Sequence, residues 1–208
     1  MSARRPPSLV PTIALFVLIS CGSGWAQESP LVLTPERTKA AFAWGLTAPE
    51  KDLEQYELHS DVSWLVNFDT PWLRVAQFAR ATKIQRHDAS EDDIPAAVAA
   101  PEVHIYAHAQ RSGDSEKSGM RLPDVEYLSI FRPREDRPDE IILPLSIQTF
   151  IRRVPQRDVF TSRTLIARSA RGTFPASAFR AGNRLRIVFG GGASDTVLIP
   201  ETLLASIR

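Results

Sequence analysis

Apolar and polar residues alternate with a period of two along three segments, at residues 62–68, 103–108 and 184–189. Successive side chains of a β-strand point to opposite faces, so this period predicts strands with one buried and one solvent-facing side. The side chains expected on the buried faces are Val62, Trp64, Val66, Phe68, Val103, Ile105, Ala107, Leu185, Ile187 and Phe189. Weaker patterns predict further strands near residues 55–60, 125–131, 141–150, 162–168 and 195–199.

Two segments carry the signals of a helix start. Thr34 precedes Pro35, and Thr70 precedes Pro71; Thr is a favoured N-cap and Pro fits the first helical turn. An Ala-rich run follows Pro35 as far as Gly45, which we expect just beyond the end of the first helix. We expect both helices to pack against the main sheet, the second through the face formed by Trp72, Val75, Ala76 and Ala79. Residues 200–207 are expected to form a short helical turn.

These elements predict a mainly β protein. The chain contains 16 Pro and 10 Gly, which favours short strands and turns over a helical bundle. We expect an antiparallel β-sandwich or open barrel with two short appended α-helices, after an N-terminal signal segment. The length of residues 27–208 suits one globular domain.

Residues 1–26 have the pattern of a signal peptide. Arg4 and Arg5 give a positive start, and an apolar stretch follows at residues 9–19. That stretch is too short to anchor the chain across a bilayer, which takes about 20 residues. We therefore expect an exported protein, either periplasmic or extracellular.

Two cleavage sites fit this segment. Residues 24–26 (Gly-Trp-Ala) resemble an ordinary signal-peptidase site, which would release the chain at Gln27. Residues 18–21 (Leu-Ile-Ser-Cys) resemble a lipoprotein box, which would leave a lipidated Cys21 and a membrane tether at the new N-terminus. Cys21 is the only cysteine, so residues 27–208 contain neither a disulfide nor a cysteine-based catalytic or metal site.

His59 and Asp61 are the catalytic candidates of the sequence. Two residues apart on a strand, they would share a face, and the carboxylate could orient the imidazole for base catalysis. Residues 27–208 contain no Gly-x-Ser-x-Gly motif that would supply a serine nucleophile. Two polar residues at the end of a strand are the plainer interpretation.

His104, Tyr106 and His108 are candidates for ligand binding. On a helix, the two histidines could share a metal ion, but on a strand their backbones lie about 13 Å apart. The sequence therefore predicts no metal site and no cofactor. The remaining hypothesis is an amphipathic strip that stacks on a ligand such as a sugar ring, and the plainer interpretation is a solvated strand face.

Charge is distributed unevenly along the chain. Residues 27–140 hold 13 Lys and Arg against 21 Asp and Glu, a net charge of −8, whereas residues 141–208 hold 10 Arg against 3 acids, a net charge of +7. Arg184 and Arg186 could form part of a patch for phosphate, carboxylate or an acidic glycan, because guanidinium binds such groups in a bidentate way. Alternatively, the two parts of the domain neutralise each other. The basic part shows no pattern of alternating basic and aromatic residues that would support nucleic-acid binding, and the export signal argues against it.

The glycine and acidic runs do not predict phosphate or calcium sites. Residues 190–192 are consecutive glycines and fit a hairpin turn, not a phosphate-binding loop. The acidic runs at residues 91–93 and 136–140 lack the spacing of an EF-hand loop, so solvated loops are expected there.

The sequence-based hypothesis is an exported envelope protein of non-catalytic type, a β-sandwich module that acts by binding or by structural interaction. Its ligand is not identified by the sequence, and an anionic ligand or an envelope component is the candidate partner. One alternative is a secreted hydrolase or lyase that acts on a glycan or ester through His and Asp residues. Another is a calcium-dependent adhesion module.

Overall fold

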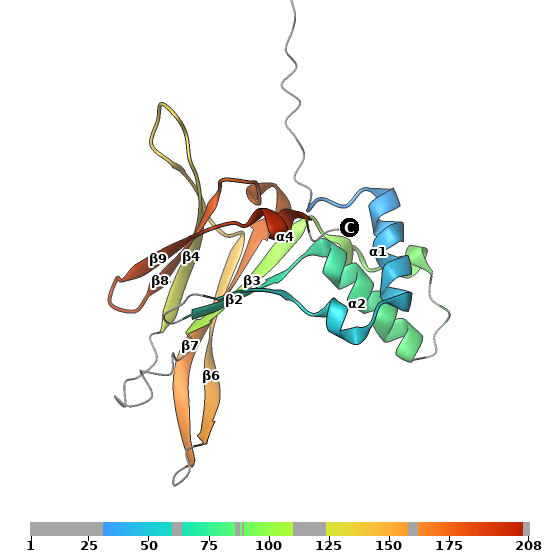
Figure 1. Cartoon of the computed structure of the whole chain (residues 1–208), viewed down its shortest axis with the longest axis horizontal. Coiled ribbons are helices and arrows are strands. Elements are labelled where there is room, and N and C mark those ends of the chain that lie inside the picture. The colour runs from blue at the N-terminus through green and yellow to red at the C-terminus, as the bar shows by residue number, and fades with distance from the viewer. Residues whose placement is uncertain are drawn as a thin grey trace, which may run out of the picture.

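The computed structural model describes residues 31–59, 64–85, 88, 90–109, 124–157 and 162–205. The protein is mainly β, with two antiparallel sheets and a few short helices (Figure 1). The five-stranded sheet has the order β1 (Tyr56–His59), β2 (Trp64–Asp69), β3 (Glu102–Ala109), β7 (Ser162–Pro175) and β6 (Ser146–Arg157). The four-stranded sheet has the order β5 (Glu140–Ile142), β4 (Val125–Arg132), β8 (Arg184–Phe189) and β9 (Ser194–Leu198).

One hydrophobic core joins the inner faces of the two sheets. β2, β3 and β7 contribute to it from one sheet, and β4 and β8 from the other. The alternation of the three clearest strands is confirmed, since all their predicted inward residues between Trp64 and Phe189 are buried; Val62 lies outside the described residues. Phe68 and Phe174 both meet the Phe179 ring edge-on, with ring centroids 6.2 and 6.4 Å away.

A polar bond also connects the sheets. Trp64 lies in the core on β2, and its indole Nε1 donates to Asp195 Oδ2 of β9 at 2.6 Å. A buried indole N–H needs an acceptor, and here the acceptor is supplied by the other sheet.

The weaker patterns predicted the bounds of the strands less accurately than the three clear alternations did. β1, β4 and β9 correspond to the segments expected near residues 55–60, 125–131 and 195–199. The segment 141–150 was predicted as one strand but contains the end of β5 and the start of β6, separated by Pro144 and its neighbours. β7 extends seven residues beyond the predicted end at residue 168. The hairpin turn at residues 190–192 joins β8 to β9, with Gly191 and Gly192 at φ values of 87° and 84°.

The predicted helix starts are confirmed. α1 spans Pro35–Thr47 and α2 spans Pro71–Ile84. Thr34 Oγ1 accepts from the Arg37 N–H, and Thr70 Oγ1 accepts from the Leu73 N–H, both at 3.3 Å. The predicted end of the first helix is wrong, because Gly45 lies inside α1. A Cβ on Gly45 would collide with the backbone of Ala76, so this glycine lets α1 approach α2 closely.

The prediction that both helices pack against the main sheet is also wrong. α1 and α2 pack on each other and form a helical layer with η1 (Glu50–Leu53), η2 (Glu91–Asp93) and α3 (Ala96–Ala99), beside the strands in Figure 1. Phe42 and Trp72 belong to a buried cluster of this layer that is separate from the core between the sheets. Two helices that bury their apolar faces against each other leave little apolar surface for the sheet.

Two short helical elements complete the described chain. η4 (Ala176–Ala178) follows β7, and α4 (Glu201–Ala205) forms the helical turn expected near the end of the chain. Within the ranges that the structure describes, no helix is long and apolar enough to span a membrane.

Candidate functional site

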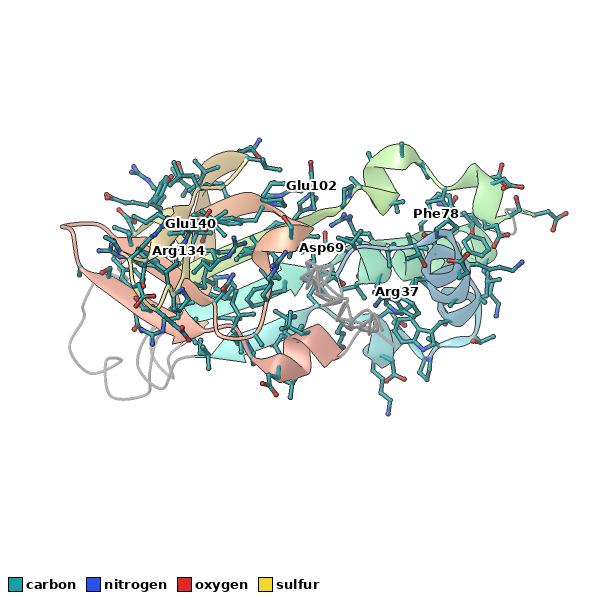
Figure 2. All side chains as sticks on the ribbon, turned by 90° about the horizontal axis from the view of Figure 1, so that it is seen from above. Arg37, Asp69, Phe78, Glu102, Arg134 and Glu140 are labelled. Atoms are coloured by element: carbon teal, nitrogen blue, oxygen red, sulfur yellow. The ribbon has the colours of Figure 1, made fainter. Side chains whose placement is uncertain are left out.

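The five-stranded sheet carries a polar cluster on the face turned away from the core. His104, Tyr106 and His108 lie there on β3, each half-buried, while the residues between them point into the core. In the antiparallel register, Asp69 of β2 lies opposite His104, and Arg171 of β7 lies opposite Tyr106. Figure 2 shows Asp69 at the junction between the strands and the helices.

His104 lies between the Asp69 carboxylate and the Arg171 guanidinium group. Its Nδ1 lies 3.3 Å from Asp69 Oδ2 and 2.9 Å from an Arg171 guanidinium nitrogen. Guanidinium can only donate, so the bond from Arg171 requires a lone pair on His104 Nδ1. Nδ1 then has no proton to give to Asp69. This geometry differs from that of a catalytic dyad, in which Nδ1–H donates to the carboxylate.

The same guanidinium covers Tyr106. The Arg171 Cζ lies 5.1 Å from the centre of the Tyr106 ring, a cation–π contact. Four buried polar atoms on this face have no hydrogen-bond partner among the residues described: Asn67 Oδ1, Asp69 Oδ1, Ser169 Oγ and Arg171 Nε. Because these atoms are shielded from solvent and the ring is covered by the guanidinium, the cluster is a packed polar layer. The stacking of a sugar ring on Tyr106 stays a prediction.

Arg74 of α2 fixes the edge of this cluster. Its guanidinium donates to the backbone carbonyls of Asp69, Val98, Ala100 and Glu102 at 2.9 to 3.1 Å. Burial lowers the pKa of Arg74, and the nearby carboxylates of Asp69 and Glu102 oppose that shift. The side chain therefore ties the start of α2 to the last residue of β2 and the first residue of β3.

The other predicted catalytic and modification sites cannot be placed. Asp61 and Cys21 lie outside the described residues, and so does the side chain of His59, whose backbone pairs with Leu65 at the end of β1. A catalytic role for His59 and Asp61 stays a prediction, as does lipidation of Cys21.

The four-stranded sheet carries a second candidate, which we call the arginine hollow. Arg184 and Arg186 lie on the outer face of β8, two residues apart, and line a hollow of about 280 Å³. The other lining residues come from β4, β9 and the connection before β5: Phe131, Asp139, Ser194 and Thr196. In the antiparallel register, Phe131 lies opposite Arg184, and Thr196 lies opposite Arg186.

The two arginines of the hollow differ in how they are held. The Arg186 guanidinium lies 5.7 Å from the centre of the Phe131 ring and donates to Ser194 Oγ at 3.1 Å, so its orientation is fixed. Arg184 is exposed. Neither arginine forms an ion pair with a carboxylate of the described chain, and Asp139 is the only acid among the lining residues. The hollow therefore presents net positive charge to solvent.

A neighbouring group of charges is, by contrast, internally paired. Glu140 Oε2 accepts from Arg132 at 3.2 Å and from Arg134. The bond from Arg134 is the main cause that holds the pKa of Glu140 below its usual range. These two arginines are therefore paired with a carboxylate, whereas Arg184 and Arg186 form no ion pair in the described part of the chain.

In the acidic run at residues 91–93, the side chain of Asp93 serves local structure. Asp93 accepts from the backbone N–H and the hydroxyl of Ser90 in the capping box of η2, and the backbone bond lowers its pKa. Nowhere in the described ranges do three His, Cys, Asp or Glu side chains come together as they would around a metal ion.

The sequence indicated only part of the arginine hollow. Arg184 and Arg186 were predicted from the charge pattern, whereas Phe131, Asp139, Ser194 and Thr196 were not. The strand register that places Phe131 opposite Arg184 is absent from any local pattern. The nearest sequence signal is the hairpin glycines, which imply that Thr196 lies beside Arg186.

Comparison with other proteins gives no further guide to the ligand. No model of a known protein family matches the chain, and the searches of curated proteins and of solved structures found no match either. The chemistry of the side chains is therefore the basis for a functional proposal.

Proposed function

We propose that this chain is an exported, non-catalytic binding protein of the cell envelope, a β-sandwich module that holds an anionic glycan in the arginine hollow. The observation that carries the proposal is that two guanidinium groups without a carboxylate partner, Arg184 and Arg186, line one hollow of the four-stranded sheet. Guanidinium groups bind carboxylates through two parallel hydrogen bonds, and they remain charged at any physiological pH.

The remaining lining residues suit the neutral part of such a ligand. Ser194 and Thr196 offer hydroxyls, and the carboxylate of Asp139 accepts hydrogen bonds from sugar hydroxyls. The volume of about 280 Å³ is at the lower end for ligand pockets, so one acidic sugar unit fills it and the rest of a chain would extend over the sheet.

No specific observation favours the alternative functions. A hydrolase that used two histidines and an acid would bring them together in a pocket, whereas His104 shares its Nδ1 with Arg171 and Asp69 on a packed face. A calcium-dependent module would need a cluster of oxygen ligands, and the acidic side chains Asp93 and Glu140 are engaged in local contacts.

The export part of the proposal rests on residues 1–26 and is tested by intact mass. We expect the mature protein from the envelope or medium to begin at Gln27, or at a lipidated Cys21. A full-length chain recovered from the cytosol would contradict export and leave the binding proposal standing.

The binding part is tested by calorimetric titration with a hexasaccharide of galacturonic acid. We expect binding that weakens as salt rises, and a double variant Arg184→Ala with Arg186→Ala that binds at least about 100-fold more weakly, since a hydrogen bond to a charged group contributes about 1.5–3 kcal/mol. The neutral galactose hexasaccharide should not bind.

The matched control removes two positive charges elsewhere. Lys39 and Lys51 lie in the helical layer, away from the arginine hollow. The double variant Lys39→Ala with Lys51→Ala should bind like the wild type. An equal loss in both double variants would show that net charge acts instead of the hollow, and equal binding of the neutral hexasaccharide would rule out the anionic ligand.

A further inference from the structure

A second hollow lies where the helical layer meets the five-stranded sheet, and nothing in the proposed function uses it. Its volume is about 130 Å³. Trp44 reaches it from α1, Trp72 from the start of α2, and Tyr56 from β1. Asp52 of η1 and Glu54, which follows η1, also line it.

The aromatic side chains form its walls. The rings of Trp44 and Trp72 lie 6.2 Å apart between centroids and are inclined by 41°, with Trp72 buried and Trp44 half-buried. Tyr56 is held in place because its hydroxyl is 2.7 Å from Thr202 Oγ1 of α4. The faces of such rings carry negative electrostatic potential and attract cations, with Trp the strongest of the three aromatic types.

All charged side chains that line this hollow are acidic. Asp52 and Glu54 are exposed, and no ion pair engages either carboxylate in the described part of the chain. No Lys, Arg or His lines the hollow. Two free carboxylates beside three aromatic rings therefore make a site whose potential favours a positive ligand.

The inner end of the hollow is polar at one point. Thr70 is buried, with a relative exposure of 6%, and its Oγ1 accepts from the Leu73 N–H. A hydroxyl oxygen has a second lone pair, which can accept from an ammonium or hydroxyl group of a ligand.

We propose that this hollow binds a small organic cation with an alkylammonium head group. About 130 Å³ corresponds to roughly four water molecules at about 30 Å³ each, enough for the head group and a short alkyl chain. Trp44, Trp72 and Tyr56 surround the cation, and Asp52 and Glu54 balance its charge at the mouth. A bare metal ion is a poor fit, because aromatic walls offer it no oxygen ligands.

The test is a calorimetric titration of the full mature chain with choline, and with its uncharged isostere 3,3-dimethyl-1-butanol. We expect choline to bind and the isostere, which has the same shape, to bind at least about tenfold more weakly, because only the cation gains from the rings and carboxylates. n-Butylamine, added in a third titration, shows whether a primary ammonium is also accepted. Failure of choline and n-butylamine to bind, or equal binding of the isostere, would overturn the proposal.

Variants separate the hollow from the rest of the surface. Asp52→Asn with Glu54→Gln keeps the side-chain shapes and should weaken choline binding about tenfold, and Trp44→Leu should also weaken it. Glu50→Gln with Asp92→Asn removes two exposed carboxylates of the same layer that do not line the hollow, and should leave binding unchanged. Equal losses in the two double variants would contradict the site. The arginine hollow is on the other sheet, so these results leave the glycan proposal unaffected.

Discussion

Arg74 and Gly45 show how far the role of one residue can depend on contacts that its neighbours in sequence do not reveal. Arg74 lies on the predicted second helix, where an arginine would ordinarily reach into solvent, yet its guanidinium satisfies four backbone carbonyls of β2, β3 and the segment before β3. Gly45 has the position of a helix-ending glycine in the sequence but acts as the contact point between two helices. Both roles come from tertiary contacts, which local propensity does not encode.

Replacing Arg74 should destabilise the fold strongly. In Arg74→Ala, four carbonyls at the junction lose the guanidinium donor, and of these Ala100 O keeps its bond from the Glu102 N–H. We expect the free energy of unfolding to fall by about 3 kcal/mol, because a part-buried acceptor left without a partner costs about 1–3 kcal/mol. Arg74→Lys should recover only part of this, since one ammonium cannot reach carbonyls spread over three segments. The measurement is the urea midpoint, with Arg80→Ala on the same helix as the control. Equal midpoints for Arg74→Ala and Arg80→Ala would contradict the role of Arg74.

A methyl group on Gly45 should also destabilise the protein, although Ala is the better helix former. In an exposed helix interior, Gly→Ala stabilises by about 1 kcal/mol. At Gly45 the added Cβ meets the Ala76 backbone, so we expect Gly45→Ala to cost about 1–3 kcal/mol in the free energy of unfolding. Ala43→Gly, at an exposed position of α1, measures the propensity effect alone. A stabilising Gly45→Ala would show that the helices can move apart freely.

At the scale of elements, the alternation of apolar and polar residues predicted the strands whose inner faces are fully buried. It missed strand residues whose conformation is set by pairing with neighbouring strands. β3 and β8 were predicted because Val103 and Leu185 begin clean alternating runs. The second half of β7 was missed because its inward positions are Ala170, Gly172 and Phe174, and only the last is large enough to signal a core. Its strand structure is set by pairing with β3 on one side and β6 on the other.

The two candidate sites, like the strands, could be predicted only in part from the sequence. The row of His104, Tyr106 and His108 on one face followed from the period of β3. The contacts of Arg171 with that row depend on the missed half of β7, so the local sequence could not reveal that the face is packed. Arg184 and Arg186 were found from charge alone, and only the register supplied the hollow around them.

The β4–β5 hairpin should show a pH-dependent contribution from Glu140. The pKa of this carboxyl is lowered from 4.5 by its bond from Arg134, so its ionised form favours the folded state. The stabilisation should be complete above the ordinary pKa and disappear as the pH falls through the lowered pKa. We expect Glu140→Gln to have a lower urea midpoint than the wild type at about pH 7, and the two midpoints to converge near about pH 2.

The control for Glu140 is Glu135→Gln in the same hairpin. Glu135 is exposed and has no ion pair in the described part of the chain. Its midpoint should follow the wild type at each pH. High salt should reduce the difference caused by Glu140→Gln, because solvent reaches this half-buried group and its ion pairs are screened. A difference that stayed constant down to about pH 2 would show that packing, not charge, is responsible.

At the scale of the whole molecule, the protein has two separately buried regions. The core between the sheets includes Phe68, Phe174 and Leu185, and the helical layer has its own clusters around Phe42 and Leu53. Both proposed binding sites depend on this division. The arginine hollow is on the outer face of one sheet, whereas the second hollow, lined by Trp44, Trp72 and Tyr56, lies along the boundary of the helical layer. Figure 2 shows Arg134 and Glu140 at one end of the molecule and Phe78 at the other.

Two cores with little shared surface should open separately. Amide hydrogen exchange measures the free energy of local opening residue by residue, and contiguous units with few contacts to the rest open before the whole molecule unfolds. We expect the amides of α1 and α2 to exchange about ten to a hundred times faster than those of β3 and β8. Phe42→Ala, which removes a buried ring from the helical layer, should cost that layer about 3 kcal/mol. Its effect should be confined to the helices, leaving exchange in β3 and β8 unchanged. Equal acceleration in helices and strands would show one cooperative unit, in which Arg74 transmits the loss from the helical layer to the sheet.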